Sequence, residues 1–286
     1  MLGNFVTGVS IVAPAGMLPE LSQEFGVSIR EAGLLITFGA FVLCIASPVS
    51  AWLTSRVDRR VLLSISVAVM AAAQFASMLA PSYAALMTIR LLMLAVAALF
   101  TPQAAGTAAM MVPPERRGST MSYVFLGWSL ALAIGLPLVA YVANHVSWRV
   151  AYGGIGIIAL LNLAMLISRI PHGLVGTPVE LKTWADLARN PLIVLLLVIT
   201  VLQTSGQFVV FTYLGPLFAK LGGDAQLAII AFSIYGVMGF IGNVIASRVV
   251  DSWGGYRTSL VAIAVMLLGI AMWAFGAGFV PLMLAS

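Results

Sequence analysis

The chain has 286 residues, of which 62% are hydrophobic and only 8% are charged. An average soluble domain is about 45–50% apolar and about 25% charged. The Lys, Arg, Asp and Glu residues of this chain are therefore too few to cover the surface of a soluble protein of its size. The composition excludes a soluble enzyme, a nucleic-acid-binding module and a disordered tail, and it predicts an all-α polytopic membrane protein.

Apolar segments long enough to cross a membrane follow one another along the chain, since a spanning helix needs about 20 mainly apolar residues. Nine are expected, at about 3–19, 32–54, 61–80, 84–112, 120–143, 149–169, 191–218, 226–248 and 258–276. The first follows Met1 without a basic region, so we interpret it as a span and not as a cleaved signal. A tenth apolar run begins near Pro281, but the chain stops at Ser286.

Basic residues alternate from one side of the predicted membrane to the other. One side holds ten of them: Arg56, Arg59, Arg60, Arg116, Arg117, Arg169, Lys182, Arg189, Arg248 and Arg257. The other side holds only Arg30, Arg149 and Lys220, and Arg90 falls inside the fourth span. The positive-inside rule places the ten residues and the N-terminus in the cytoplasm. We expect a multi-pass protein of the bacterial inner membrane, whose net charge of +5 reflects orientation and not a nucleic-acid partner.

The longest polar connector, residues 170–190, divides the chain. Its stretch Thr177-Pro178-Val179-Glu180 has a Thr cap, Pro at the first helical position and Glu at the third. This pattern predicts a short helix on the cytoplasmic interface that ends at Asn190-Pro191. We therefore expect a six-helix half at 1–170, a linker at 171–190 and a partial second half at 191–286, with helices seven to nine and the start of a tenth.

Two loops indicate an internal repeat. Residues 51–60 read AWLTSRVDRR and residues 247–256 read SRVVDSWGGY, each after the second span of its half. The same offset of 196 residues aligns Asn4 with Thr200 and Thr7 with Gln203, in the first and seventh spans. Parallel repeats of six spans are one architecture of secondary transporters.

The repeated loop resembles the signature G-x-L-A-D-R-x-G-R-R of the major facilitator superfamily. The first copy keeps Leu53, Arg56, Arg59 and Arg60, whereas Ala51, Ser55 and Asp58 replace its first Gly, its Asp and its second Gly. The second copy keeps Asp251 and Gly254. The resemblance covers essentially the whole chain and is greatest to the drug:proton antiporters and sugar (arabinose) efflux-like permeases. It implies a fold of twelve transmembrane helices, of which about nine are present, so the chain is expected to be C-terminally incomplete.

Two further motifs have both a functional and a structural interpretation. The loop residues Arg56, Asp58, Arg59, Arg60, Asp251 and Gly254 match a cytoplasmic gate in which acids pair with arginines, or they are simply positive-inside charges. In the fifth span, Gly127, Gly135 and Pro137 resemble the antiporter motif of the family. Close helix packing is the alternative explanation for that motif.

Polar side chains inside the spans indicate a substrate cavity. The resemblance implies that the first, fourth, seventh and tenth spans line it, and that the fourth-span Arg90 takes part in proton coupling or cavity electrostatics. The other candidates are Asn4 and Thr7 in the first span and Gln203, Thr204 and Gln207 in the seventh. The alternatives are an Arg90 that extends to the interface and polar residues that only join helices.

These features predict a secondary active transporter that moves a small molecule by alternating access. We expect efflux of a drug or sugar-like compound, coupled to protons, although the acids all lie in loops or near span ends. Glu20 and Glu31 are the acids nearest the outer mouth, and the carrier could also lie in the missing spans. The alternatives are a metabolite uptake permease and a truncated, non-transporting remnant or regulatory protein. No catalytic motif is present, and no metal or cofactor is expected.

Overall fold

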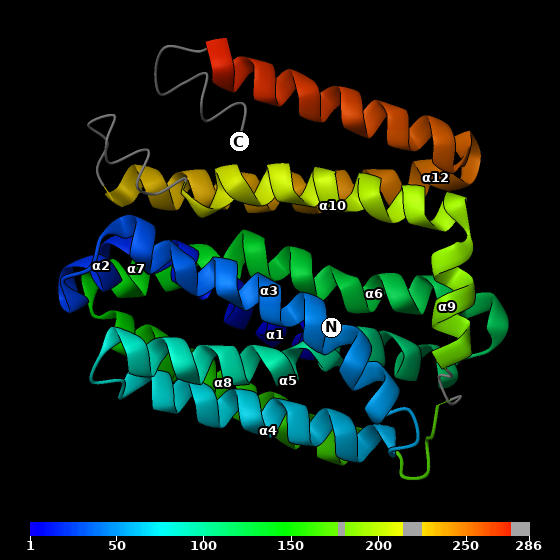
Figure 1. Ribbon diagram of the computed structural model, residues 1–286, viewed down its shortest axis with the longest axis horizontal. Helices are drawn as coiled ribbons and strands as arrows, with labels where there is room; N and C mark the ends of the chain where they lie inside the picture. Colours follow the sequence, from blue (N-terminus) through cyan, green and yellow to red (C-terminus); the bar gives the residue numbers. More distant parts are fainter. Residues whose placement is uncertain (177–180, 214–224, 276–286) are drawn as a thin grey trace.

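The computed structural model describes residues 1–176, 181–213 and 225–275, and these ranges are almost wholly helical (Figure 1). Six of the described helical segments are long and apolar enough to cross a membrane. They comprise α1 (Leu2–Val12), η1 (Ala13–Met17) and α2 (Leu18–Phe25); α3 (Ile29–Leu53); α4 (Arg59–Met78); α5 (Tyr83–Met110); α6 (Arg117–Leu130), η3 (Ala131–Gly135) and α7 (Leu136–His145); and α8 (Trp148–Arg169). The six expected spans of the first half are confirmed.

The remaining described helices are α9 (Leu181–Arg189), α10 (Pro191–Thr212) and α12 (Ala225–Phe275). Helix α12 contains a break at Gly254, whose φ of 76° favours glycine, and the chain reverses there (Figure 1). Their apolar stretches, Pro191–Gly206, Ile229–Ile245 and Tyr256–Gly269, fall where the seventh, eighth and ninth spans were predicted. The predicted helix start at Thr177–Glu180 lies outside the described residues.

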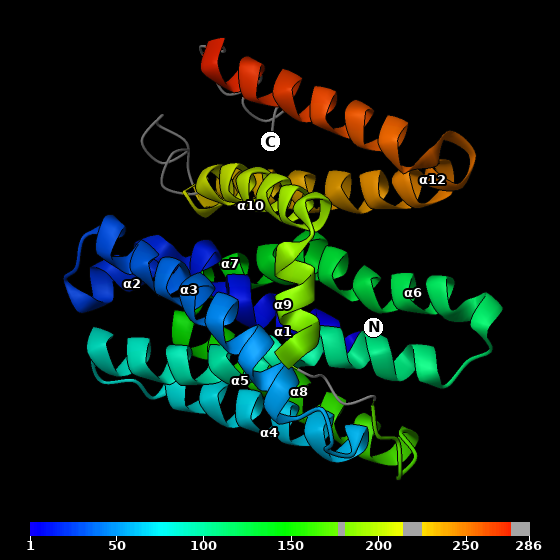
Figure 2. The same ribbon diagram turned by 45° about the vertical axis from the view of Figure 1, so that its right-hand side comes forward.

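The first six spans form one bundle, here called the N-terminal bundle (Leu2–Arg169), and α10 and α12 lie along one side of it (Figures 1 and 2). We name the two ends of the molecule after the short helices found there. The α2 end holds α2 and the start of α8, and the α9 end holds the loop between α3 and α4 together with α9 (Figure 1). Buried apolar side chains from several spans fill the bundle in two clusters, one around Tyr152 and one around Phe100.

Proline interrupts the first and fifth spans but not the second and fourth. Pro14 is the second residue of the 3₁₀ segment η1, and Pro137 follows the π-helical turn η3. A proline lacks the N–H that an α-helix would use to bond the carbonyl four residues earlier. Pro48 and Pro102, in contrast, lie inside continuous helices α3 and α5. The two interruptions pack on each other, since a Cβ atom at Gly16 of η1 would lie 2.9 Å from Leu136 Cδ1 of α7.

Local capping explains the turn between α2 and α3. Gly26 ends α2 in the left-handed conformation, with φ 62°, and its N–H donates to the Ser22 carbonyl. Ser28 then caps α3 and forms a capping box with Glu31, whose carboxylate accepts from the Ser28 N–H at 2.7 Å. The Glu31 carboxylate therefore has a structural task at the α2 end.

Candidate functional site

Arg90 lies wholly inside the N-terminal bundle, with no exposed surface. Its Nη2 donates to the Ser10 carbonyl at 3.2 Å and to the Ile11 carbonyl at 3.1 Å, both in the last turn of α1. Its Nε and Nη1 are also buried and have no hydrogen-bond partner among the described residues. The side chain does not extend to the membrane interface, which was one of the two interpretations of its position.

The two carbonyls bonded by Arg90 are those that an N–H at residue 14 would have served. An α-helical bond from residue 14 would reach Ser10, and a 3₁₀ bond would reach Ile11. Because residue 14 is proline, it can donate to neither, and a carbonyl left unbonded in an apolar interior is costly. The Arg90 guanidinium takes the place of the missing N–H. A side chain of the fourth span thus supplies hydrogen bonds to carbonyls at the break in the first span.

Asn4 and Thr7 are also buried in the bundle and are bonded within it. Asn4 Nδ2 donates to the Val124 carbonyl of α6 at 3.1 Å, and its Oδ1 accepts from Thr101 of α5 at 2.5 Å. The Thr7 hydroxyl donates to the Gly3 carbonyl one turn earlier. A cavity of about 250 Å³ adjoins Asn4, and its lining includes Gly3, Phe100 and Asn162. The structure thus places the polar first-span residues inside the bundle and not on the surface that faces α10.

The seventh-span candidates lie on α10. Gln203 and Thr204 are exposed, and the side chain of Gln207 lies outside the described residues. Thr200, one turn before Gln203, donates to the Leu196 carbonyl of its own helix. The predicted sites in the first and fourth spans are therefore joined through the interior, whereas the described seventh-span side chains stay apart from them.

Apolar and aromatic side chains join the N-terminal bundle to α10 and α12 near the two proline interruptions. Val12 and Ala15, which flank Pro14, and Leu136, which precedes Pro137, form one buried cluster with three residues of the other side, Phe211, Ala231 and Phe232. The Phe211 and Phe232 rings meet edge to face at 5.7 Å. We call these six residues the aromatic contact. Tyr213 adds to it, since its hydroxyl would lie 2.7 Å from a Cβ atom at Gly33 of α3.

The glycines of the fifth span pack closely against the first. A Cβ atom at Gly127 would lie 2.2 Å from the Met1 carbonyl oxygen, and one at Gly135 would lie 2.2 Å from Val9 Cγ2. The π turn that precedes Pro137 faces α12, where a Cβ atom at Gly236 would lie 2.2 Å from Ala133 Cα. The fifth span therefore packs on α1 through its motif glycines, Gly127 and Gly135, and on α12 through the π turn that precedes Pro137.

The signature loop at the α9 end contacts the start of the linker. Asp58 Oδ1 caps α4 by accepting from the Arg60 and Val61 N–H groups, and Oδ2 accepts from the Gly173 N–H at 2.6 Å. This bond from Gly173 holds the pKa of the Asp58 carboxyl below its usual value. The Arg59 N–H donates to the Leu174 carbonyl at 2.8 Å. We call the pairing of 58–59 with 173–176 the linker clasp.

The other gate-loop candidates take different positions. The Arg59 side chain is buried against Gly176, where a Cβ atom would lie only 1.8 Å from Nη2. Arg56 is exposed and Arg60 is half-buried, whereas Gly254 forms the break in α12. The side chain of Asp251 lies outside the described residues. The structure thus joins Asp58 and Arg59 to the linker. Both lie apart from the described part of the second copy of the signature loop, residues 247–256.

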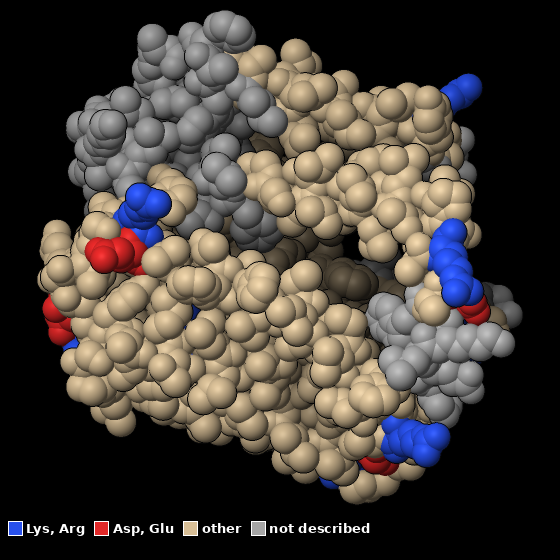
Figure 3. All heavy atoms as spheres, viewed as in Figure 1, with Lys and Arg blue, Asp and Glu red and all other residues tan. Residues whose placement is uncertain are grey.

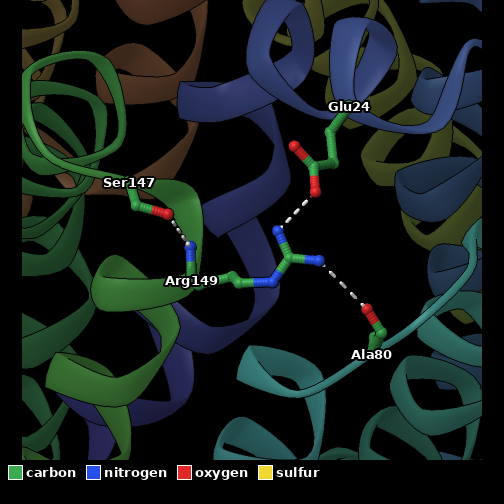
Figure 4. A network of polar contacts seen from close by, with 4 residues as sticks. All are labelled: Glu24, Ala80, Ser147 and Arg149. Carbon is green, nitrogen blue, oxygen red and sulfur yellow. Dashed lines mark hydrogen bonds and ion pairs between the residues drawn. The ribbon is translucent and has the colours of Figure 1, made fainter.

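An ion pair at the α2 end ties three segments of the bundle together (Figure 4). Arg149 Nη1 contacts Glu24 Oε1 at 2.5 Å, and Nη2 donates to the Ala80 carbonyl at 3.4 Å. The guanidinium also stacks on the Trp148 ring, 4.2 Å from its centroid. The start of α8 is thereby fixed to the end of α2 and to the loop between α4 and α5.

The surface is hollowed between α10 and the N-terminal bundle, toward the end where α9 lies (Figure 3). The part of this hollow that faces the viewer carries no charged side chain among the described residues, and the charged groups in view lie at the periphery (Figure 3). The aromatic contact joins the two sides, so the hollow is the space between two bodies that touch along only part of their facing surfaces.

Sequence reasoning missed the partners of the polar candidates. Thr101 bonds Asn4, and the fully buried Tyr152 hydroxyl lies beside Arg90 without hydrogen-bonding geometry. Gln74 of α4 is also fully buried, and its amide has no partner among the described residues. Each is a polar residue in an apolar span, which was the available signal, but spacing within one span does not show which neighbouring span it faces.

Comparison with known proteins agrees with this architecture. The crystal structure of a D-xylose-proton symporter matches with a TM-score of 0.77 and 20% identity, over 99% of this chain and 76% of that one. A partially occluded, inward-open structure of the xylose transporter XylE from E. coli matches with a TM-score of 0.77 and 17% identity, over 99% and 77%. An inward-open structure of the same transporter matches with a TM-score of 0.67.

At these identities the structural likeness concerns the fold. The family model described as Major Facilitator Superfamily matches residues 1–286. The helical fold and the membrane spans described above agree with this match. The chain belongs to the Major Facilitator Superfamily of membrane transporters.

Proposed function

We propose that this protein is a secondary active transporter that exports a small, uncharged sugar-like or amphipathic compound in exchange for protons. The observation that carries the proposal is the hollow between two bodies of helices that touch at the aromatic contact, which shows no charged side chain of the described residues on the face in view (Figure 3). In alternating access, two such bodies rock around a central site. In this proposal the N-terminal bundle is one body, and α10 and α12 belong to the second.

The chemistry of the hollow favours an uncharged substrate. The exposed Gln203 and Thr204 offer amide and hydroxyl groups that hydrogen-bond to hydroxyls. Asn4, Thr7, Gln207 and Arg90 complete the proposed substrate set. Asn4, Thr7 and Arg90 are buried in the N-terminal bundle in this structure, so the proposal requires them to become accessible during the cycle. Arg90 would then offer the two donors that have no partner among the described residues. Two of the similar structures are named in their titles as xylose-proton symporters, which supports a sugar-like substrate here as a proposal.

Orientation and direction form part of the same proposal. The ten loop arginines and lysines counted above place the N-terminus and the α9 end in the cytoplasm of a bacterial inner membrane. The hollow then faces the cytoplasm, where a compound for export would enter. Uptake of a metabolite by the same fold is the second candidate, since two of the similar structures are of xylose-proton symporters.

Glu20 is the better proton carrier of the two acids near the outer mouth. Its Oε2 is buried without a hydrogen-bond partner among the described residues, beside Asn144. Glu31, in contrast, is held by the capping box of α3. We expect Glu20→Gln to remove the response of transport to a pH gradient, whereas Glu31→Gln should keep it.

Transport by the purified chain in proteoliposomes tests the proposal. A panel of labelled pentoses, hexoses and an uncharged amphipathic compound is first screened for ligands that raise the midpoint temperature of unfolding. Flux of the compound that binds is then followed with an imposed pH gradient and with a protonophore. We expect gradient-driven flux that the protonophore abolishes. Binding and flux indistinguishable from empty liposomes throughout the panel would favour the non-transporting alternative.

Substitution of the polar residues of α10 locates the site. Gln203→Leu and Gln207→Leu should raise the substrate concentration needed for half-maximal flux, because each removes an amide from the proposed site. Gln23→Leu on the exposed face of α2 is the matched control. Unchanged affinity in both α10 variants would show that these amides only join helices.

A further inference from the structure

We propose that Arg90 is a positioning residue that holds the break in the first span and, through it, the aromatic contact. The proposal rests on the transporter function above only in treating this contact as the closed side of the cycle. It assigns to Arg90 a task beyond substrate electrostatics, and that task is visible in two hydrogen bonds to the backbone.

The donor of Arg90 matches the position of the missing N–H. Arg90 Nη2 reaches the two carbonyls that an N–H at residue 14 could bond, that of Ser10 in an α-helix and that of Ile11 in a 3₁₀ helix. Ala13, which directly precedes the proline, still bonds back to the Val9 carbonyl, so the normal pattern ends at Pro14. The donor comes from a residue 79 and 80 positions away, so the break depends on a tertiary contact and not on local capping.

The break lies directly beside the aromatic contact. Val12 and Ala15 follow the two bonded carbonyls and flank Pro14; both are 2% exposed and share a buried cluster with Phe211 of α10 and Phe232 of α12. If the turn relaxes, the surface on which the two aromatic rings rest changes shape. A contact between rigid packed surfaces does not deform continuously, so a small change there separates the two bodies.

Two donors of the Arg90 guanidinium are not used by the break. Nε and Nη1 are buried without acceptors among the described residues, and the Tyr152 hydroxyl lies close by. A ligand oxygen bound to these two donors would pull the rigid guanidinium toward itself and so shift Nη2 relative to the Ser10 and Ile11 carbonyls. Occupancy of the site would thereby loosen the break, which gives Arg90 a physical means to link the site to the contact.

A suppressor substitution tests this role directly. Pro14→Ala restores an N–H at residue 14, so the turn no longer needs Arg90. The reporter is Ala15→Cys in a Cys44→Ser background, labelled from the α2 side by a membrane-impermeant maleimide. Ala15 is almost fully buried beneath the aromatic contact, and Cys44 is the only cysteine of the chain. Val146→Cys, which is 66% exposed, gives the maximal labelling rate.

We expect Arg90→Ala to raise the labelling rate of the reporter about tenfold or more, since charge-assisted hydrogen bonds are lost. The double variant Pro14→Ala/Arg90→Ala should return the rate to near that of the parent, and Arg30→Ala should leave it unchanged. Ala231→Cys, on the opposite side of the contact, serves as a second reporter. An unchanged rate in Arg90→Ala, or an equally raised rate in the double variant, would overturn the proposal.

Loss of folding is itself informative. If Arg90→Ala fails to insert, the proposal expects Pro14→Ala to restore insertion, and Arg90→Lys provides a charged variant with a smaller increase in labelling. Failure of Pro14→Ala to improve either variant counts against the role. Because labelling needs no substrate, a wild-type protein that transports nothing would refute the proposed function without touching this result.

Discussion

The α2 end and the α9 end of the molecule are held together in different physical environments. Toward the α2 end, two contacts are buried, that of Arg90 with the carbonyls of α1 and the aromatic contact on η1 and α7, and the Arg149–Glu24 ion pair adds a contact at the surface. At the α9 end, the linker clasp is made by an aspartate and backbone groups at the surface.

This difference predicts which perturbations each end will respond to. Polar contacts in an apolar interior are strong and costly to break, because no water replaces a lost partner. Contacts at a surface are weak, and they respond to pH and salt. Substitutions should therefore disturb the α2 end most, whereas solution conditions should disturb the α9 end.

The largest effect is expected for Arg90→Met, which keeps the length of the side chain and removes its donors. The Ser10 and Ile11 carbonyls then lose their hydrogen bonds to Arg90 in the core, at a cost of about 3 kcal/mol. The midpoint temperature of unfolding in detergent should fall accordingly. Arg30→Met, at an exposed arginine near the same end, is the control and should change the midpoint little. Equal effects of the two variants would contradict the comparison.

A smaller loss is expected for Gly236→Ala, at the contact between α12 and the π turn. The new Cβ atom would lie 2.2 Å from Ala133 Cα, and backbone cannot yield as a side chain can. Overpacking of this kind costs about 1–3 kcal/mol. Gly239→Ala, one turn further along the same helix, meets no described atom within 4 Å. We expect thermal unfolding to shift for Gly236→Ala alone, and equal shifts would mean that this contact is loose.

The ion pair at the α2 end should contribute still less. Arg149 and Glu24 are 36% and 43% exposed, and pairs so accessible to solvent contribute about 0–1 kcal/mol. Arg149→Ala also removes the stacking on Trp148, whereas Glu24→Gln removes only the charge. Unfolding midpoints should therefore fall more for Arg149→Ala than for Glu24→Gln. The opposite order would assign the main contribution to the ion pair itself.

The sequence predicted the spans because each is a long apolar run, and that signal is local. It also identified Arg90, since a charge in a span is costly and therefore needs a partner. The partner, however, is a pair of backbone carbonyls released by Pro14, and carbonyls leave no mark in a sequence. Only the packing of α5 against α1 shows that the two features belong together.

The signature loop shows the same limit. Asp58 was recognised as a replacement of a motif glycine. Its two structural tasks, however, use partners at very different distances along the sequence. Its capping of α4 follows from its position before an apolar helix. Its bond to Gly173 joins residues 115 positions apart, which no local pattern predicts. The side chains of Gln207 and Asp251 lie outside the described residues, so their proposed roles stay predictions.

The smallest effect is expected at the linker clasp, and there pH is the variable. The bond from the Gly173 N–H lowers the pKa of Asp58 in the folded protein. A carboxyl whose pKa is lower in the folded than in the unfolded protein stabilises the fold at any pH above its unfolded-state pKa. This stabilisation is lost as the pH falls through the folded-state pKa. The clasp should therefore hold at neutral pH and open in acid. Proteolysis of the linker in detergent should accelerate as the pH falls below about 4, measured with an acid-active protease.

Asp58→Asn separates this titration from a general effect of acid. The amide can still accept the hydrogen bonds that cap α4, but it carries no charge and does not titrate. Cleavage in the 170–176 segment should be faster than in the parent at neutral pH, and its pH dependence should be flatter. A parent and a variant with the same pH profile would show that the linker is held by the Arg59–Leu174 backbone bond alone. The α9 end would then resemble the α2 end in its indifference to pH.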